Sequence, residues 1–364
     1  MKQLVFTVTN DLLYDQRMIR ICSSLHNAGY KILLIGRSHK NTQPIVPQLF
    51  RQKRIRCFFQ KGKWLYIEYN IKLFFYLLWQ PMHLVCAIDL DTILPCYLVS
   101  KLRRKKRVYD AHELFCEMKE VVSRPAVYKI WKWVERSTVP HFSNGYTVNE
   151  YISHILQKEY GVQYAVIRNM PLLQDNCAAA EANQPFVLYQ GAVNEGRSFE
   201  TLIPAFQWID VPLWICGDGN FLQQAMALAQ QYGLQQKVIF KGKILPAALK
   251  KITPQATLGI TLFEHNGLNN YYSLANRFFD YMHAGVPQLC VAYPAYEAIN
   301  KQYKVAILIN NLSPASIAQA INETLADKVL LHQMHENCLQ ARAVLNWQME
   351  EKKLIHFYHQ IFQR

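Results

Sequence analysis

Short apolar runs alternate with amphipathic stretches along most of the chain. The first run, "KQLVFTV" at residues 2–8, is followed by residues 15–29, whose apolar positions recur at helical spacing and end at Gly29, and then by the apolar run "YKILLIG" at 30–36. A strand, a helix and a second strand in this order are typical of parallel β/α structure. The alternation continues through residues 83–113 and 145–171, so we expect a doubly wound sheet.

The alternation stops once and then starts again. The segment "LLQDNCAAAEANQP" at 172–185 is small, polar and without periodicity, and a second series of strand and helix patterns follows from "FVLYQG" at 186–191. We therefore predict an α/β protein with two Rossmann-like domains that face a cleft. The predicted parts are an N-terminal domain at 1–170, a linker at 171–185, a second domain at 186–345, and a last amphipathic helix at 346–364.

Composition limits the class of protein. The 364 residues are 51% hydrophobic and 18% charged, which suits two buried cores rather than a disordered chain. The nine cysteines form no CxxC pair and no Cys/His cluster with zinc spacing, which favours reduced thiols in a cytoplasmic protein. Residues 71–91 are the most apolar stretch, but Lys72, Gln80, Pro81 and two aspartates interrupt it, and Asp11 comes too early for a signal peptide.

The net positive charge of the chain comes from its first half. Residues 1–170 hold 26 lysines and arginines against 12 acidic residues, whereas residues 171–364 hold 14 of each. Two clusters dominate, at 51–64 and 101–107. Their partner is an anionic membrane surface, a nucleic acid, or an anionic glycan or lipid diphosphate, unless they form only a solvated basic face.

Several glycines and cations follow strands of the second domain. Gly191 opens a loop that carries Arg197 ahead of a helix, Gly217 lies in "CGDG", and Lys241 and Lys243 lie in "FKGK". Because the carboxyl ends of parallel strands share one edge of a sheet, we expect these loops to converge there on a phosphate group. In the first domain, His112 and Glu113 end a strand at the equivalent edge. The triplet "DLD" at 89–91 is interpreted as helix capping and loop structure rather than a metal motif.

The stretch "SLANRFFDYMHAGVP" at 273–287 predicts a short helix that ends at Gly285. Asn276 is a plausible N-cap, which would place Asp280 early in the helix, beside Arg277. Two interpretations stay open. Asp280 is an acid that complements the helix dipole, or it is a carboxylate aimed at a ligand.

The chain resembles the GT-B glycosyltransferases of family 4, also called glycosyl transferases group 1, over nearly its whole length. The matching motifs are "NDLLYDQRMIRICSSLHNAGYKILLIGR", "VYDAHELF", "TVNEYISHIL", "VIRNMP", "YQGAVNEGRSFETLI", "WICGDG" and "SLANRFFDYMHAGVP". The last is the most specific, since it follows the family's pattern of Asn, a base, two apolar residues, an acid, Tyr and Met. The last helix also fits, because in this fold it crosses back to the first domain.

This resemblance implies transfer of a sugar with retention of configuration, from a UDP- or GDP-sugar, with no required metal ion and no further cofactor. Asp280 would bind the ribose hydroxyls, Arg197 would stabilise the leaving diphosphate, and His112 would lie beside the donor sugar. We take His112 and Arg197 as catalytic. The predicted donor-binding residues are Gly191, Gly217, Lys241, Asn276, Arg277 and Asp280.

Two departures from the family pattern affect acidic and N-terminal positions. The family has a second glutamate eight residues before the Asp280 position, where this chain has Tyr272, and Glu264 lies too far upstream to match it. The family's N-terminal glycine pair is replaced by "TNDLLYDQR", in which Asp15 and Arg17 could shape the acceptor side. A third departure is that a basic residue often found after the first strand of the second domain is missing, so Lys241 or Lys243 would have to substitute.

The main functional hypothesis is a retaining glycosyltransferase that extends a bacterial surface polysaccharide or a lipid-linked oligosaccharide. Its partners would be the nucleotide-sugar, a glycan or lipid-linked acceptor, and an anionic inner membrane touched peripherally from the cytoplasm. Aromatic residues among the cations, such as Phe58, Phe59 and Trp64, suit such contact. The alternatives are an isomerising GT-B enzyme, a non-catalytic nucleic-acid or glycan-binding protein, and a dead scaffold. No motif for nucleic-acid recognition is present.

Overall fold

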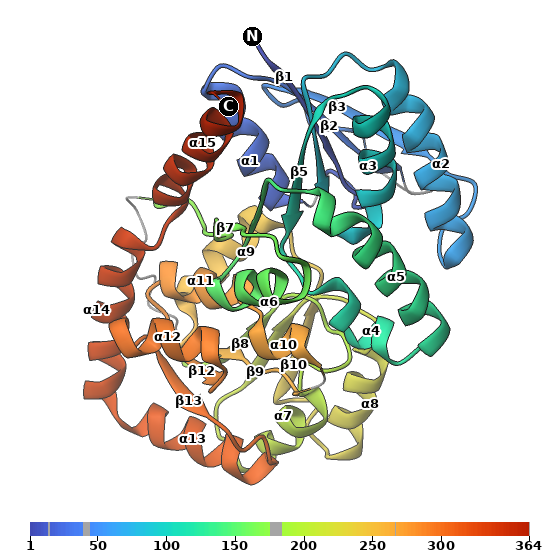
Figure 1. Cartoon of the computed structure of the whole chain (residues 1–364). Coiled ribbons are helices and arrows are strands. Elements are labelled where there is room, and N and C mark those ends of the chain that lie inside the picture. The colour runs from blue at the N-terminus through green and yellow to red at the C-terminus, as the bar shows by residue number, and fades with distance from the viewer. Residues whose placement is uncertain (14, 39–43, 175–183, 266, 364) are drawn as a thin grey trace. The chain divides into compact units, whose positions relative to one another are not determined.

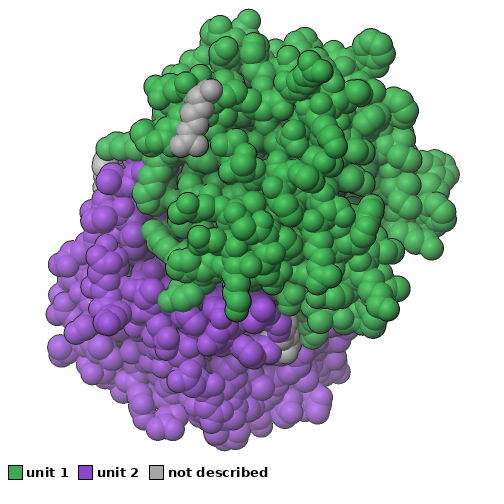
Figure 2. Space-filling view, viewed as in Figure 1, with its two compact units in different colours: residues 1–169, 350–364 green, residues 170–349 purple. Residues whose placement is uncertain are grey.

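The computed structural model describes residues 1–13, 15–38, 44–174, 184–265 and 267–363. The chain divides into two compact units, which Figure 2 colours separately. Unit 1 consists of Met1–Asn169 and Glu350–Arg364, and unit 2 of Met170–Met349. Each unit contains one parallel sheet covered by helices, so the α/β prediction is confirmed.

The sheet of unit 1 has seven strands in the order β3-β2-β1-β4-β5-β6-β7, all parallel. Its central strands are buried on both faces, which explains their continuous apolar sequence. Their bounds are β1 Gln3–Thr7, β2 Lys31–Ser38, β3 Arg51–Arg56, β4 Leu84–Ile88, β5 Lys106–Ala111, β6 Gly145–Thr147 and β7 Ala165–Val166.

Helices cover both faces of this sheet (Figure 1). Helices α2, α3 and α5 lie on one side, and α1 and α15 on the other. The α-helices of unit 1 are α1 Gln16–Asn27, α2 Lys63–Trp79, α3 Ile93–Leu102, α4 Lys119–Val122, α5 Pro125–Thr138 and α6 Glu150–Tyr160, and α15 spans Trp347–Gln363. Short 3₁₀ turns are η1 Leu90–Thr92, η2 Phe115–Glu117 and η3 Val139–His141.

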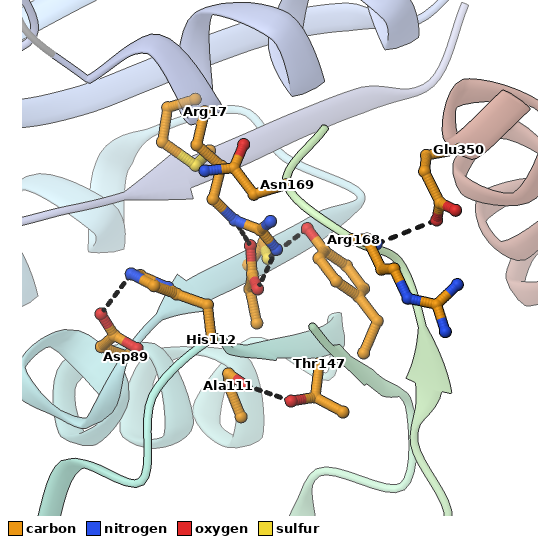
Figure 3. A network of polar contacts seen from close by, with 12 residues as sticks. Arg17, Asp89, Ala111, His112, Thr147, Arg168, Asn169 and Glu350 are labelled. Carbon is orange, nitrogen blue, oxygen red and sulfur yellow. Dashed lines mark hydrogen bonds and ion pairs between the residues drawn. The ribbon is translucent and has the colours of Figure 1, made fainter. Parts of the chain in front are cut away.

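The last helix joins the core of unit 1 through aromatic residues. Tyr358 is fully buried and packs on Phe6 and Tyr146 at ring distances of 6.0 and 6.3 Å. The Glu350 carboxylate accepts the backbone N–H of Arg168 at 2.9 Å (Figure 3). The first residues of α15 belong to unit 2, where the Trp347 N–H donates to the Pro171 carbonyl, so the division falls at Glu350 and not at the predicted residue 346.

Unit 2 holds a six-stranded parallel sheet in the order β10-β9-β8-β11-β12-β13. Its strands are β8 Val187–Gln190, β9 Leu213–Cys216, β10 Val238–Gly242, β11 Leu258–Thr261, β12 Gln288–Val291 and β13 Ala306–Ile309. Its helices are α7 Phe199–Ala205, α8 Leu222–Gln231, α9 Pro246–Ile252, α10 Leu268–Tyr272, α11 Asn276–His283, α12 Pro294–Tyr303, α13 Pro314–Ala326 and α14 Lys328–Val344, with 3₁₀ turns η4 Phe206–Trp208 and η5 Thr253–Gln255.

The structure contains elements that the hydrophobic pattern did not predict. Strand β3 is the basic sequence "RQKRIR", in which only Ile55 is buried, because it is the edge strand of its sheet. Helix α2 was missed because its apolar residues surround the helix, so no period of 3.6 stands out. Strand β13 and helices α4, α10, α12 and α14 were also missed.

Two predictions from composition can be compared with the structure, one on the cysteines and one on membrane-spanning segments. The eight described cysteines are free thiols, seven of them buried, and Cys177 lies outside the described residues. Within the described ranges, no helix combines the length and the apolar character needed to cross a membrane.

Candidate active site

The loops after β8 and β9 are pressed against each other in unit 2. Gly191 adopts a φ of 120°, and its N–H donates to the Cys216 carbonyl at 3.0 Å. A Cβ on Gly217 would lie 1.8 Å from the Gly191 carbonyl oxygen, which no side chain can tolerate. Both predicted glycines are therefore needed for backbone packing, which holds the two loops at one edge of the sheet.

Two arginines contact the same aromatic ring beside these loops. The Arg197 guanidinium carbon lies 4.4 Å from the centre of the Phe263 ring, and that of Arg277 lies 4.9 Å from the same centre. Arg277 also lies 4.4 Å from the Tyr189 ring centre and donates to the Gln190 carbonyl at 3.3 Å. Sequence reasoning did not foresee that both cations would contact Phe263.

Arg277 is a buried cation held by neutral groups. Only 8% of its surface is exposed, and its neighbours are aromatic rings and a backbone carbonyl. Among the described residues, no carboxylate forms an ion pair with it. A cation in this setting favours an anionic ligand, because an uncompensated buried charge is costly.

Asp280 is the end of a short polar chain. Its Oδ2 accepts a hydrogen bond from Gln190 Nε2 at 3.2 Å, and Gln190 Oε1 accepts one from Thr253 Oγ1 at 2.8 Å. Gln190 and Thr253 are buried, whereas Asp280 is partly exposed. The structure thus fixes the Asp280 carboxylate at the carboxyl end of β8, close to the loop of Gly191.

The start of α11 differs from the prediction. The N-cap is Ala275, in extended backbone, and Asn276 is the first helical residue rather than the cap. Asp280 is the fifth residue of the helix, and no acid occupies the first turn. Compensation of the helix dipole therefore does not explain Asp280, because that effect fades beyond the first turn.

Lys241, which was predicted to bind the donor, lies against an aromatic ring. Lys241 Nζ lies 4.1 Å from the centre of the Trp214 ring, and Trp214 in turn stacks on Phe186. The substitution of Lys241 or Lys243 for the missing basic residue stays a prediction.

Tyr272 and Glu264 are placed by the loops after β11. Tyr272 ends α10 and packs edge-on against Tyr271 at 4.9 Å. Glu264, which was too distant by sequence count, donates its backbone N–H to the Gly196 carbonyl at 3.1 Å. The fold thus brings an acid to the residue preceding Arg197, which spacing along the chain could not reveal.

In unit 1, His112 faces an acid from the neighbouring strand end (Figure 3). His112 Nε2 lies 3.1 Å from Asp89 Oδ2, and these residues follow the paired strands β5 and β4. Asp89 has a φ of 54°, an unusual value for a residue other than glycine. Nδ1 of His112 and Oδ1 of Asp89 are buried with no hydrogen-bond partner among the described residues.

The "DLD" triplet contains one half-buried acid, Asp89, and one buried acid, Asp91. Asp89 precedes η1 but makes no capping hydrogen bond through its side chain, so the capping interpretation was wrong for it. Burial and the nearby carboxylates of Glu113 and Asp91 raise the pKa of Asp89 well above its usual value. Asp91 accepts a short hydrogen bond from Thr9, and burial raises its pKa to about 7.

The residues expected to shape the acceptor side are used by the fold itself. Arg17 and Asp110 form a buried, two-pronged ion pair with contacts of 2.7 and 3.3 Å. Asp15 is the N-cap of α1 and accepts the Met18 N–H at 3.0 Å. Both side chains thus have structural roles, although Nη1 of Arg17 has no hydrogen-bond partner among the described residues, and their role on the acceptor side stays a prediction.

A pocket of about 210 Å³ opens instead at the carboxyl ends of β1 and β2. Asp11 at its wall pairs with Arg54 of β3 at 2.7 Å, and the Tyr69 hydroxyl donates to the Val8 carbonyl. Its lining residues are Thr9, Asn10, Asp11, Arg37, Leu65, Tyr66 and Tyr69. The mixture of polar groups and tyrosine rings suits a polyhydroxylated ligand.

No cluster of three or more histidines, cysteines or acids with metal-binding geometry occurs in the part of the chain that the structure describes. The predicted absence of a metal site stays a prediction.

Comparison with known proteins places this arrangement in context. Residues 175–340 match the model of the family described as glycosyl transferases group 1. No curated protein matches the chain.

Solved structures match the chain along nearly its whole length. Sucrose-phosphate synthase from Thermosynechococcus elongatus is similar with a TM-score of 0.81 and 17% identity, covering 100% of both chains. WaaG, a glycosyltransferase involved in lipopolysaccharide biosynthesis, has a TM-score of 0.77 and 15% identity, covering 97% of this chain and 98% of its own. HepE from Anabaena, in complex with UDP and glucose, has a TM-score of 0.76 and 12% identity, covering 99% and 100%.

Proposed function

We propose that this chain, a glycosyltransferase of the GT-B fold whose residues 175–340 form its group 1 domain, extends a bacterial surface polysaccharide or lipid-linked oligosaccharide. The donor is a nucleotide-sugar, either a UDP- or a GDP-sugar, and transfer retains the anomeric configuration without a required metal ion. The observation that carries the proposal is the pair of guanidinium groups over Phe263.

Arg197 and Arg277 bind the donor diphosphate in this proposal. Both guanidinium groups contact Phe263, and a diphosphate bound by both would offset their positive charge. As the bond from the anomeric carbon to the phosphate oxygen breaks, negative charge grows on the leaving group and both contacts strengthen. Two fixed cations supply the charge that a divalent ion supplies in other phosphate sites.

Asp280 recognises the ribose. Its carboxylate can accept hydrogen bonds from two neighbouring hydroxyl groups, and Gln190 fixes its orientation from the other side. The buried Thr253–Gln190 contact keeps that amide in place. The aspartate is one methylene shorter than the glutamate of the family pattern, and the support from Gln190 sets its reach.

His112 contacts the donor sugar, and Asp89 is its positioning residue. The 3.1 Å contact between His112 Nε2 and Asp89 Oδ2 orients the imidazole. The strained backbone at Asp89 supports this role, since such strain is concentrated at functional sites.

The pocket beside β1 and β2 receives the acceptor. Its polar lining and its tyrosines suit one sugar residue of a glycan, and Asp91 lies directly behind Thr9. WaaG is described as involved in lipopolysaccharide biosynthesis, and HepE structures hold UDP and UDP-glucose, which supports an acceptor and donor of these classes.

Calorimetric titration tests the donor assignment. The full chain is titrated with UDP, GDP, ADP, dTDP and their sugar conjugates in the presence of EDTA. We expect one nucleotide class to bind, and Arg197→Ala to weaken it about tenfold through loss of a charge-assisted contact. Lys250→Ala, at an exposed position of α9, is the matched control and leaves the affinity unchanged. Absence of binding to every nucleotide at millimolar concentration would refute the proposal.

A further inference from the structure

Helix α2 carries large apolar side chains on two opposite faces. Leu65, Tyr69, Leu73 and Leu77 are buried against unit 1. A second stripe, at spacings of three and four residues, faces outward and consists of Trp64, Ile67, Ile71, Phe75 and Trp79. Trp79 is 84% exposed. A helix that is apolar all round is normally covered on all sides, but the described chain covers only one face of α2.

The loop before α2 extends this exposed stripe. Phe58 is 82% exposed and packs edge-on against Phe59 at 5.3 Å, and Phe59 stacks on Trp64 at 6.2 Å. We call the exposed residues Phe58, Phe59, Trp64, Ile67, Ile71, Phe75 and Trp79 the α2 surface. Because a helix rises about 1.5 Å per residue, this surface runs for roughly 25 Å along α2.

The stretch of sequence that contains the α2 surface is rich in positive charge. Residues 51–79 contain seven lysines and arginines and one acid, Glu68. The Glu68 carboxylate has partners within the protein. It pairs with Lys72 at 2.6 Å and accepts hydrogen bonds from the backbone N–H groups of Phe58 and Phe59. Basic residues often protect an edge strand from pairing with other chains, which would explain the cations of β3. This protection does not explain the exposed aromatic and aliphatic side chains of α2.

Exposed apolar side chains together with positive charge favour one class of binding partner. A second copy of the chain would bring the same positive charge against itself, and a nucleic acid would leave the isoleucines uncovered. An anionic lipid bilayer matches both features, because its headgroups attract lysine and arginine and its interface accepts apolar and aromatic side chains. Tryptophans stand at both ends of the stripe, as is common at the level of lipid headgroups.

We infer that the α2 surface docks onto an anionic lipid bilayer with α2 lying in the plane of the interface. The buried face of α2 stays in unit 1, so the helix does not need to leave the protein. The inference specifies the membrane contact of the proposed function, but it depends only on the α2 surface and is measured without catalysis. Lys61 and Lys63, both exposed, would contact the headgroups.

Vesicle flotation with the full chain tests this inference. Vesicles of phosphatidylcholine alone are compared with vesicles that contain phosphatidylglycerol as the anionic component. We expect binding to the anionic vesicles, and the double variant Ile71→Glu/Phe75→Glu should weaken it at least about tenfold, since it removes two interfacial side chains. Lys61→Glu/Lys63→Glu should weaken binding and reduce its dependence on salt.

Controls separate docking from other effects. Trp208→Ser/Val329→Ser removes two exposed apolar side chains from unit 2 and should leave vesicle binding unchanged. Circular dichroism and nucleotide titration on each variant show that folding and donor binding are intact, so failure of the donor assignment is recorded separately. Wild-type protein that ignores anionic vesicles, or Ile71→Glu/Phe75→Glu that binds them equally well, would overturn the inference. So would a wild-type dimer that this variant converts to a monomer.

Discussion

Arg17 in unit 1 and Arg277 in unit 2 are buried to nearly the same extent, with 6% and 8% of their surface exposed, yet their surroundings differ. The Arg17 guanidinium donates two hydrogen bonds to the Asp110 carboxylate inside the protein. Arg277 lies between the rings of Tyr189 and Phe263 and contacts a backbone carbonyl. The first cation is paired with a carboxylate, whereas the contacts of the second are with neutral groups.

This contrast shows that burial of an arginine does not identify its role. The partner of the guanidinium does. A buried ion pair mainly links two elements, here α1 and β5, and its loss is felt as instability. A buried cation against aromatic rings costs the protein less when removed, but its removal changes what the site can bind.

The largest effect is expected for Arg17→Met. It leaves Asp110 as an unpaired buried carboxylate, so the free energy of unfolding should fall by about 3–5 kcal/mol. Urea denaturation measures the loss. Asp110→Leu added to Arg17→Met should restore much of the stability, because the uncompensated charge is gone. A single variant as stable as the wild type would mean that the ion pair does not hold α1 to β5.

Unlike Arg17→Met, Arg277→Gln should weaken ligand binding more than it lowers the free energy of unfolding. We expect nucleoside diphosphate affinity to fall by about 2 kcal/mol, or roughly thirtyfold, while the free energy of unfolding falls by only about 1 kcal/mol. Titration calorimetry and urea denaturation on the same preparation give both values. A large loss of stability with unchanged affinity would place Arg277 in the same class as Arg17.

Asp280→Asn separates a ribose contact from a helix-packing role. Asparagine keeps an oxygen for Gln190 but loses the charge, so UDP or GDP affinity should fall about tenfold. The matched ligand is the 2′-deoxy nucleotide, for which wild type and variant should differ much less. Equal losses for both ligands would remove the ribose hydroxyls from the assignment.

Asp89→Asn probes positioning in unit 1. Turnover should fall about tenfold while nucleoside diphosphate affinity stays constant, because Asp89 acts through His112 on the sugar. ¹⁵N NMR of labelled histidine provides a readout beyond activity, since the wild-type His112 should carry its proton on Nε2 and the variant should shift toward the other tautomer. An unchanged tautomer would argue against the positioning role.

Asp91→Asn should give the smallest effect, and it depends on pH. Burial raises the pKa of Asp91 to about 7, above its unfolded value, so the folded state binds the proton more tightly. The stability that this group contributes is present below about pH 4 and is lost as pH rises toward 7. We expect Asp91→Asn to gain about 1 kcal/mol relative to wild type between pH 5 and 8, measured by urea denaturation. Parallel pH profiles of the two proteins would contradict this.

The sequence could predict features that depend on neighbours along the chain. Alternating apolar runs predicted both parallel sheets, because buried strands and amphipathic helices leave periodic patterns. The Gly285 stop of α11 and the Ser313 cap of α13 were also predictable from local backbone chemistry, and the structure contains both. Helix α2 could not be found in this way, since its second apolar face hides the period.

The candidate site depends on contacts between segments far apart in sequence. The sequence identified His112, Arg197, Arg277 and Asp280 as residues with suitable chemistry at strand ends or on a helix. It could not assign Arg17 to a buried ion pair, since its partner Asp110 is 93 residues away. Nor could it show that Arg197 and Arg277 both contact Phe263.

The sequence by itself therefore determined the class of fold, the division into two β/α series and the residue types available at each strand end, because these follow from local propensity and hydrophobic period. Only the tertiary structure decided which charged groups pair with a carboxylate inside the protein and which contact aromatic rings instead. The physical reason is that pairing of charges is set by distances across the fold, and only packing fixes those distances.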